Sequence, residues 1–174
     1  LKRILPSLKL AAHYLVKRRR RTMAQDRPNQ PGYGMLSGKT ADPDEFFHQF
    51  VLNAQAIAGL RGAATLLSIV NDPDAEISVE AEALAEATRC GLAQAWQDAP
   101  LVPTLTGEWV PFMGSWPGLA GETSLLSEPG RWFTHGTFHQ RAASVLHLAC
   151  FGLVPADDPR IQATMRALET HVLR

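Results

Sequence analysis

Residues 71–77 read Asn71-Asp72-Pro73-Asp74-Ala75-Glu76-Ile77, and this stretch decides the fold. Aspartate followed by proline is a typical helix start. The Asp carboxylate accepts hydrogen bonds from the free N–H groups of the first turn, and proline has no N–H to satisfy. We therefore expect Asp72 to cap a helix and the preceding helix to end just before it. The same pair recurs at Asp42-Pro43 and at Asp158-Pro159, so the sequence predicts a largely α-helical fold.

Apolar residues recur at helical spacing on both sides of this turn. The helix before it is predicted over about 44–70, with a buried stripe of Phe46, Phe50, Ile57, Leu60, Ala64 and Leu67. The helix after it has a predicted stripe of Val79, Ala83, Ala87, Cys90, Ala93 and Trp96. Residues 136–153 and 159–173 supply a second pair of helices. We expect an all-α fold of stacked αα-hairpins.

Residues 100–133 are expected to form a long loop between the two hairpins, because they are rich in proline and glycine. The segment also carries large aromatic side chains: Trp109, Phe112, Trp116, Trp132 and Phe133. A long loop of this kind is usually functional, but such rings can also fill the space between helices. The sequence leaves both interpretations open.

The net charge of zero hides a strong division along the chain. Residues 1–21 contain eight Lys and Arg and no acidic residue, whereas the remainder holds nine Lys and Arg against all 17 acidic residues. We therefore divide the chain into a basic amphipathic arm over 1–25, a Pro- and Gly-rich linker over 26–43 and a helical domain over 44–174. A basic arm on an acidic body is expected to seek an anionic surface.

The arm is predicted to be a helix from residue 7 to about residue 22, with Leu8, Ala11, Ala12, Leu15 and Val16 at helical spacing. Its candidate residues for binding an anionic surface are Lys17, Arg18, Arg19, Arg20 and Arg21. Because the helix has an apolar face that needs burial, a protein partner or an anionic membrane surface is favoured over nucleic acid.

A membrane span is not expected. The most apolar stretch, 52–70, is interrupted by Asn53, Gln55 and Arg61. The two cysteines, Cys90 and Cys150, are expected to be buried free thiols. Together these features predict a cytoplasmic or membrane-peripheral protein in a reducing compartment.

Few residues carry a spacing that supports chemistry. His135 and His139 lie four residues apart and could share an ion, but no further ligand accompanies them in a metal-binding motif, so no metal is expected. Nucleotide-binding motifs are missing from the sequence, and no cofactor is expected. The predicted ligand or partner site, where the aromatic loop meets the helix after it, consists of Trp109, Trp116, Trp132, His135 and His139.

Part of the chain resembles a known family. The segments are Gly114-Ser115-Trp116-Pro117-Gly118, Gly121-Glu122-Thr123-Ser124, an apolar helix ending in Phe151-Gly152-Leu153, and Asp157-Asp158-Pro159-Arg160-Ile161. Over residues 114–171 they resemble the α/α repeats of terpenoid cyclases and protein prenyltransferases. The resemblance implies stacked αα-hairpins. The Asp-rich motif of the cyclases and the zinc ligands of the prenyltransferases have no counterpart here.

The sequence thus favours a non-enzymatic helical interaction or accessory subunit. Its basic arm would dock it to a membrane-associated or larger assembly. The alternative is a segment of an α/α-toroid enzyme acting on an isoprenoid or a glycan, which is what the resemblance would imply.

Overall fold

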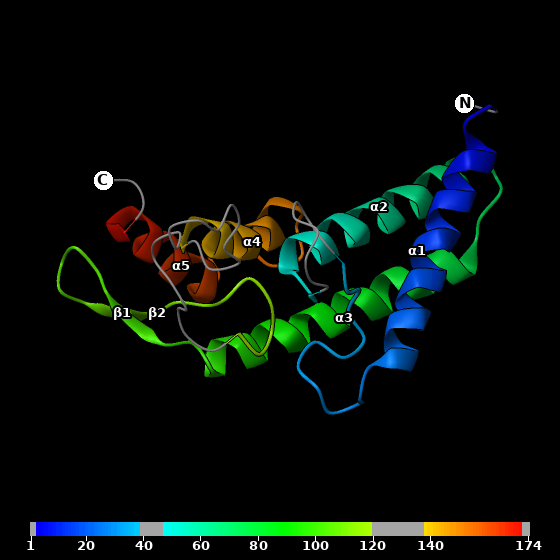
Figure 1. Cartoon of the computed structure of the whole chain (residues 1–174). Helices are drawn as coiled ribbons and strands as arrows, with labels where there is room; N and C mark the ends of the chain where they lie inside the picture. The colour runs from blue at the N-terminus through cyan, green and yellow to red at the C-terminus, as the bar shows by residue number, and fades with distance from the viewer. Residues whose placement is uncertain (1–2, 39–46, 120–137, 172–174) are drawn as a thin grey trace, which may run out of the picture.

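The computed structural model describes residues 3–38, 47–119 and 138–171, with only the backbone described for 138–143 and 171 (Figure 1). The described residues form five helices and one short antiparallel pair of strands. The elements are α1 (Leu5–Gln25), α2 (Phe50–Ile69), α3 (Ala75–Gln97), β1 (Leu101–Pro103), β2 (Trp109–Pro111), α4 (Phe138–Cys150) and α5 (Pro159–His171). The prediction of a largely α-helical fold is confirmed.

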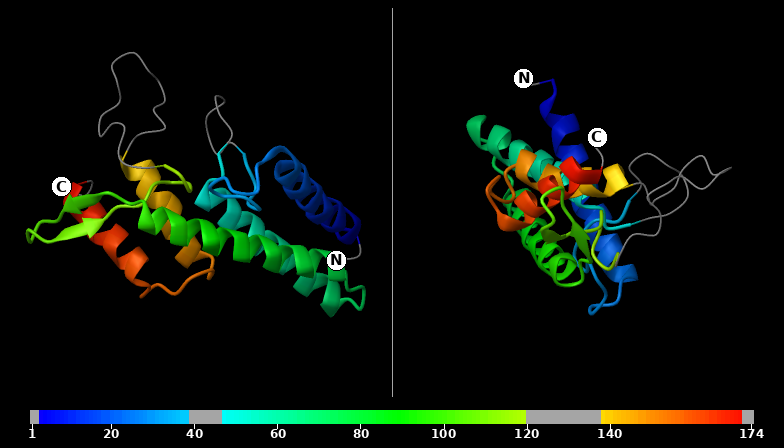
Figure 2. Two further views of the ribbon diagram at one scale, coloured as in Figure 1. Left: turned by 90° about the horizontal axis from the view of Figure 1, so that it is seen from below. Right: turned by 90° about the vertical axis from the view of Figure 1, so that its left-hand side faces the viewer.

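Helices α2 and α3 run antiparallel and form the centre of the molecule (Figure 1). Helix α1 crosses this pair at one end, whereas α4 and α5 pack at the other end beside the β1–β2 hairpin (Figure 2). The hairpin lies in the segment predicted to be loop, with Val102 paired to Val110. Residues 120–137, which hold the rest of the predicted aromatic loop, lie outside the described residues.

The turn between α2 and α3 differs by two residues from the expected one. Asp74, not Asp72, is the N-cap of α3, and its carboxylate accepts a hydrogen bond from the Ile77 N–H at 3.4 Å. Pro73 disfavours the helical conformation in the residue before it, so Asp72 stays in the turn and the next aspartate takes the capping role. Asn71 completes the reversal with a positive φ of 58°.

The other two predicted helix starts have different outcomes. Helix α5 begins at Pro159 as expected, and the Asp158 carboxylate accepts the Arg160 N–H at 2.9 Å. Helix α2 begins at Phe50, because Phe47 instead pairs with Gly38 in an isolated bridge. The predicted cap at Asp42 lies outside the described residues, but the predicted start near residue 44 was wrong.

The buried face of α2 was predicted correctly at Phe50, Ile57, Leu60 and Leu67. The predicted face of α3 was wrong, since Val79 is 67% exposed and Cys90 is exposed. The face that α3 buries is instead Ile77, Glu80, Ala81, Leu84, Ala85, Thr88, Gly91, Leu92 and Ala95. This face carries the larger aliphatic residues of the helix, so its burial removes more apolar area from water.

The two cysteines are free thiols, as expected, but both are exposed rather than buried. Helix α2 is long and apolar enough to cross a membrane by length and composition. It is also the central helix of the core, and 44% of its most apolar 18-residue stretch is buried. Core helices of soluble proteins can have the same length and apolar composition.

The segment after α1 joins the main core rather than lying on its surface. Met35 and Leu36 are buried, and the Leu36 backbone is held by the side chain of Asn53 from α2. The Asn53 amide accepts the Leu36 N–H at 2.8 Å and donates to the Leu36 carbonyl at 3.0 Å. Gly91 permits this packing, because a Cβ there would lie 2.8 Å from the Met35 sulfur.

We predict that Asn53→Ala lowers the free energy of unfolding by about 2 kcal/mol, because it leaves the buried N–H and carbonyl of Leu36 without their partner. Urea denaturation followed by circular dichroism measures the loss. The control is Thr65→Ala in the same helix, an exposed position expected to change the value by less than about 0.5 kcal/mol. Equal losses in the two variants would contradict the bridging role of Asn53.

Candidate functional site

Helix α1 is fixed to α3 by a buried carboxylate. The Glu80 side chain accepts a hydrogen bond from Arg19 at 2.6 Å and from Arg20 at 2.7 Å, one arginine on each oxygen. Arg19 also donates to the Gly34 carbonyl at 2.7 Å, so its guanidinium is held on two sides. The side chains of Arg19 and Glu80 are only 10% and 11% exposed, which makes this a largely desolvated ion pair.

The Glu80 carboxyl group is stabilised in its charged form. Burial raises the pKa of Glu80, but the hydrogen bonds from Arg20 and Arg19 outweigh burial, and the pKa lies below its ordinary value of 4.5. The carboxylate therefore remains charged in neutral solution and fastens α1 to the body.

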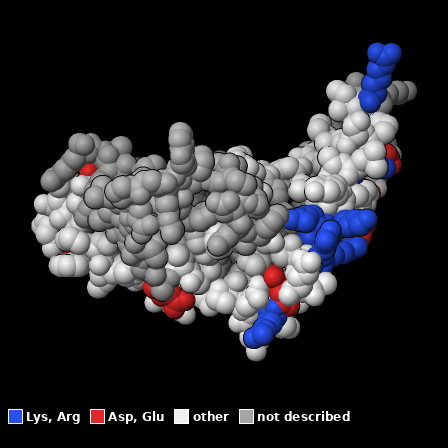
Figure 3. Space-filling model, in the orientation of Figure 1, with Lys and Arg blue, Asp and Glu red and all other residues white. Residues whose placement is uncertain are grey.

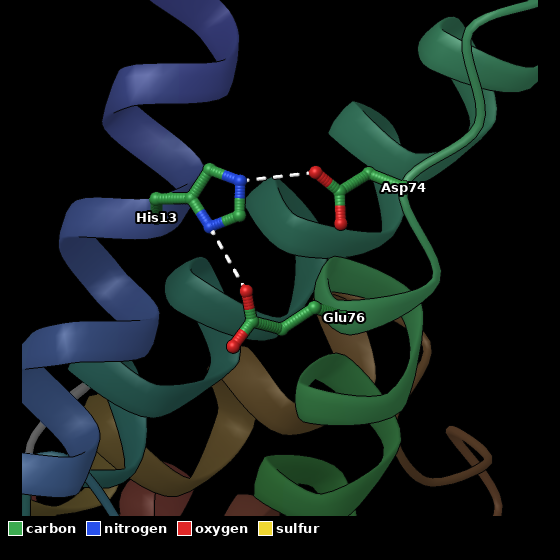
Figure 4. A group of neighbouring side chains, drawn as sticks. All are labelled: His13, Asp74 and Glu76. Atoms are coloured by element: carbon green, nitrogen blue, oxygen red, sulfur yellow. Dashed lines mark hydrogen bonds and ion pairs between the residues drawn. The ribbon is translucent and has the colours of Figure 1, made fainter.

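A second contact between α1 and the start of α3 surrounds His13 (Figure 4). The Nε2 atom lies 2.9 Å from Asp74 Oδ2, and the Nδ1 atom lies 3.4 Å from Glu76 Oε2. Partial burial raises the pKa of Asp74, but hydrogen bonds from the Ile77 N–H and from His13 outweigh it and keep that pKa below its ordinary range. Lys9, one turn earlier on α1, pairs with Asp72 at 2.7 Å.

His13, Asp74 and Glu76 are the group in the described part of the chain whose side chains could together hold a metal ion. The sequence does not reveal the group, because His13 on α1 and Asp74 at the start of α3 are 61 residues apart. No spacing rule connects them, since only the crossing of α1 over α3 brings them together.

The side of α1 that faces away from the body combines apolar and basic residues. We call Leu10, Tyr14, Lys17 and Arg21 the outer face of α1, because steps of three or four residues place them on one side of the helix. Leu10 is 73% and Tyr14 64% exposed. Lys17 and Arg21 are also exposed, and neither forms an ion pair with any described residue. Figure 3 shows the basic side chains gathered over the second half of α1.

The five basic residues predicted to bind an anionic surface therefore have different surroundings. Arg19 is buried in the ion pair with Glu80, and Arg20 is half exposed but bound to Glu80 and Glu76. Arg18 is half-buried, whereas Lys17 and Arg21 project to solvent. Within the predicted set, the structure thus separates cations that hold α1 to the body from cations that face outward.

The predicted aromatic site is only partly described. Trp109 on β2 is 62% exposed, while Trp116 stacks on Phe47 with ring centroids 4.1 Å apart. Trp132 and His135 lie outside the described residues, and His139 lies in α4, where only the backbone is described. The grouping of these five residues into one site remains a prediction.

One hollow in the described surface lies between residues 28–33 and the second half of α3. Its volume is about 250 Å³, and it is lined by Pro28, Asn29, Gln30, Gly32, Tyr33, Ala87, Cys90, Gly91 and Gln94. No charged side chain lines it, so it offers little to fix a charged ligand.

No family model, no curated protein and no solved structure matches the chain.

We expect Glu80→Ala to lower the free energy of unfolding by about 3 kcal/mol, because Arg19 would remain buried without its carboxylate. Urea denaturation measures the loss. Glu82→Ala is the matched control, two residues along the same helix. Glu82 pairs with Arg61 in solvent, where such a pair contributes less than about 1 kcal/mol. A loss at Glu80 no larger than at Glu82 would show that the ion pair does not fasten α1.

The pKa of Glu80 also predicts a pH dependence. Because that pKa is lower in the folded than in the unfolded chain, the stability from the charged form is complete above the ordinary value of 4.5. It is lost as pH falls through the lower, folded pKa. The difference in unfolding free energy between the wild type and Glu80→Gln should thus be large near about pH 7 and shrink toward about pH 3. A constant difference measured across this interval would contradict the assignment.

Proposed function

We propose that this protein is a non-enzymatic docking subunit that binds an anionic membrane surface through the outer face of α1. The observation that supports this most strongly is the composition of that face. Two large apolar side chains stand in solvent one turn from two cations that have no ion pair among the described residues. Exposed apolar residues next to basic ones are typical of helices that lie in the interface of an anionic membrane.

The two kinds of residue contribute in different ways. Full burial of one leucine-sized side chain contributes about 1.5–3 kcal/mol, and each lysine or arginine near an anionic lipid surface about 1 kcal/mol. Leu10 and Tyr14 can therefore enter the boundary between headgroups and acyl chains. Lys17 and Arg21, on the following two turns, can bind the phosphate groups.

The opposite side of α1 supports this orientation. Ala12, Val16 and Arg19 are buried against the body, so the helix does not have to leave the body to present its outer face. Arg19 and Arg20 are paired with Glu80, and Arg20 also pairs with Glu76, so both cations are already bound to carboxylates of the body. Lys17 and Arg21 form no ion pair with a described residue and remain available to a partner. Failure to bind anionic vesicles in the experiment below would leave an acidic protein surface or a nucleic acid as the partner of this face.

We expect the full chain to sediment with vesicles of phosphatidylcholine and phosphatidylserine, and less with phosphatidylcholine alone. Lys17→Gln combined with Arg21→Gln should weaken binding to the anionic vesicles roughly thirtyfold, because two lysine or arginine contacts are lost. Leu10→Ser combined with Tyr14→Ser should also weaken it, since the apolar insertion is lost.

The matched controls lie outside α1, on α3, on α5 and in the segment of the β1–β2 hairpin. Arg89→Gln with Arg166→Gln removes the same charge from exposed positions, and Leu101→Ser with Leu105→Ser removes exposed apolar side chains. Both control variants should bind like the wild type. If outer-face and control variants lose binding equally, the outer face of α1 is not the docking surface. Absence of binding to either vesicle would rule out the membrane as partner.

A further inference from the structure

The His13 imidazole lies between two carboxylates that approach its two nitrogens separately (Figure 4). The contact of Nε2 with Asp74 Oδ2 is 2.9 Å, a normal hydrogen-bond length, and that of Nδ1 with Glu76 Oε2 is 3.4 Å. An imidazole with one proton donates from one nitrogen only, and the contact of hydrogen-bond length is the one between Nε2 and Asp74.

In the tautomer whose proton is on Nε2, the lone pair of Nδ1 faces the Glu76 carboxylate oxygen. Two acceptors that face each other repel unless a cation lies between them. The cation is either a second proton on the ring or a metal ion. The same arrangement, with Asp74 receiving Nε2–H and Nδ1 left free, is the carboxylate–histidine pair that orients imidazole ligands in metal sites.

The distance between the facing acceptors fits a metal ion. Two ligand atoms bound to tetrahedral zinc at about 2.0–2.1 Å lie about 3.3–3.4 Å from each other. His13 Nδ1 and Glu76 Oε2 are 3.4 Å apart. We propose that His13 and Glu76 bind a divalent transition-metal ion of the zinc class between α1 and α3, with Asp74 orienting the imidazole from the other side.

The neighbouring side chains favour this assignment. The other oxygen of Asp74 accepts the Ile77 N–H, and the other oxygen of Glu76 accepts from Arg20 at 2.7 Å, so both carboxylates are held in place. His13 and Glu76 are 40% and 43% exposed, which leaves room for water to complete the coordination. With two protein ligands the site is weak, and it differs from the proposed docking face, which lies on the outer side of α1.

A bound ion would add a link between two helices that are distant in sequence. The ligands His13 and Glu76 come from α1 and the first turn of α3, so they meet only when α1 is packed on the body. A ligand that binds the folded chain and not the unfolded one raises stability by an amount that grows with the logarithm of its free concentration above its dissociation constant. Zinc is therefore expected to raise the melting temperature of the full chain.

The test is isothermal titration of Zn²⁺ into the metal-free full chain at about pH 7.5, where protons compete only weakly with zinc for an imidazole nitrogen. His13→Gln and Glu76→Gln should each weaken one binding event by about tenfold or more. The matched control is His48→Gln. His48 faces a single carboxylate, Asp26, at 2.8 Å, and its loss should leave this event unchanged. Melting curves recorded with a chelator show whether each variant remains folded.

Zinc that binds Cys90 or Cys150 contributes equally to all variants. The difference in zinc binding between His13→Gln and the wild type therefore reports the proposed site. Imidazole nitrogen NMR spectra supply a second reading. A shift of Nδ1 on zinc addition supports the site, whereas a ring that carries protons on both nitrogens and does not respond to zinc overturns it. Equal zinc binding by the wild type and His13→Gln also overturns it.

Discussion

The Glu80 carboxylate determines how α1 sits on the rest of the molecule. It comes from the buried side of α3 and takes one arginine of α1 on each oxygen, while Arg19 also reaches the Gly34 carbonyl. A largely desolvated carboxylate is strongly destabilised in its charged form without such partners, and a buried guanidinium is destabilised in the same way without a carboxylate. This mutual requirement fixes the rotation of α1 about its own axis, and that rotation decides which of its residues face solvent.

Once the rotation of α1 is fixed, its two sides have separate roles. The inner side supplies Ala12 and Val16 to the core. The same side of α1 carries His13, which contacts Asp74 and Glu76 at the start of α3. The outer face is left with Leu10 and Tyr14 in solvent and with Lys17 and Arg21 beyond them. The proposed docking surface and the proposed metal site both result from one crossing of two helices.

The loop after α1 reinforces the same arrangement. Met35 and Leu36 enter the core between α1 and the α2–α3 pair, with Asn53 satisfying the Leu36 backbone and Gly91 making room for Met35. His48, two residues before α2, pairs with Asp26 at the end of α1, so the two ends of the connecting segment are joined. The basic helix is thus joined to the body by apolar packing as well as by charge.

The sequence by itself determined the helical class, the start of α5 at Pro159 and the buried stripe of α2, because capping and periodicity are local properties of the chain. Only the tertiary structure decided which aspartate caps α3, which face of α3 is buried and which arginines of α1 remain available to a partner. Those outcomes depend on contacts between residues about 60 positions apart, such as Arg19 with Glu80 and His13 with Asp74. A run of arginines looks uniform in sequence. Its members acquire different roles only when a buried carboxylate from another helix pairs with some of them and not with others.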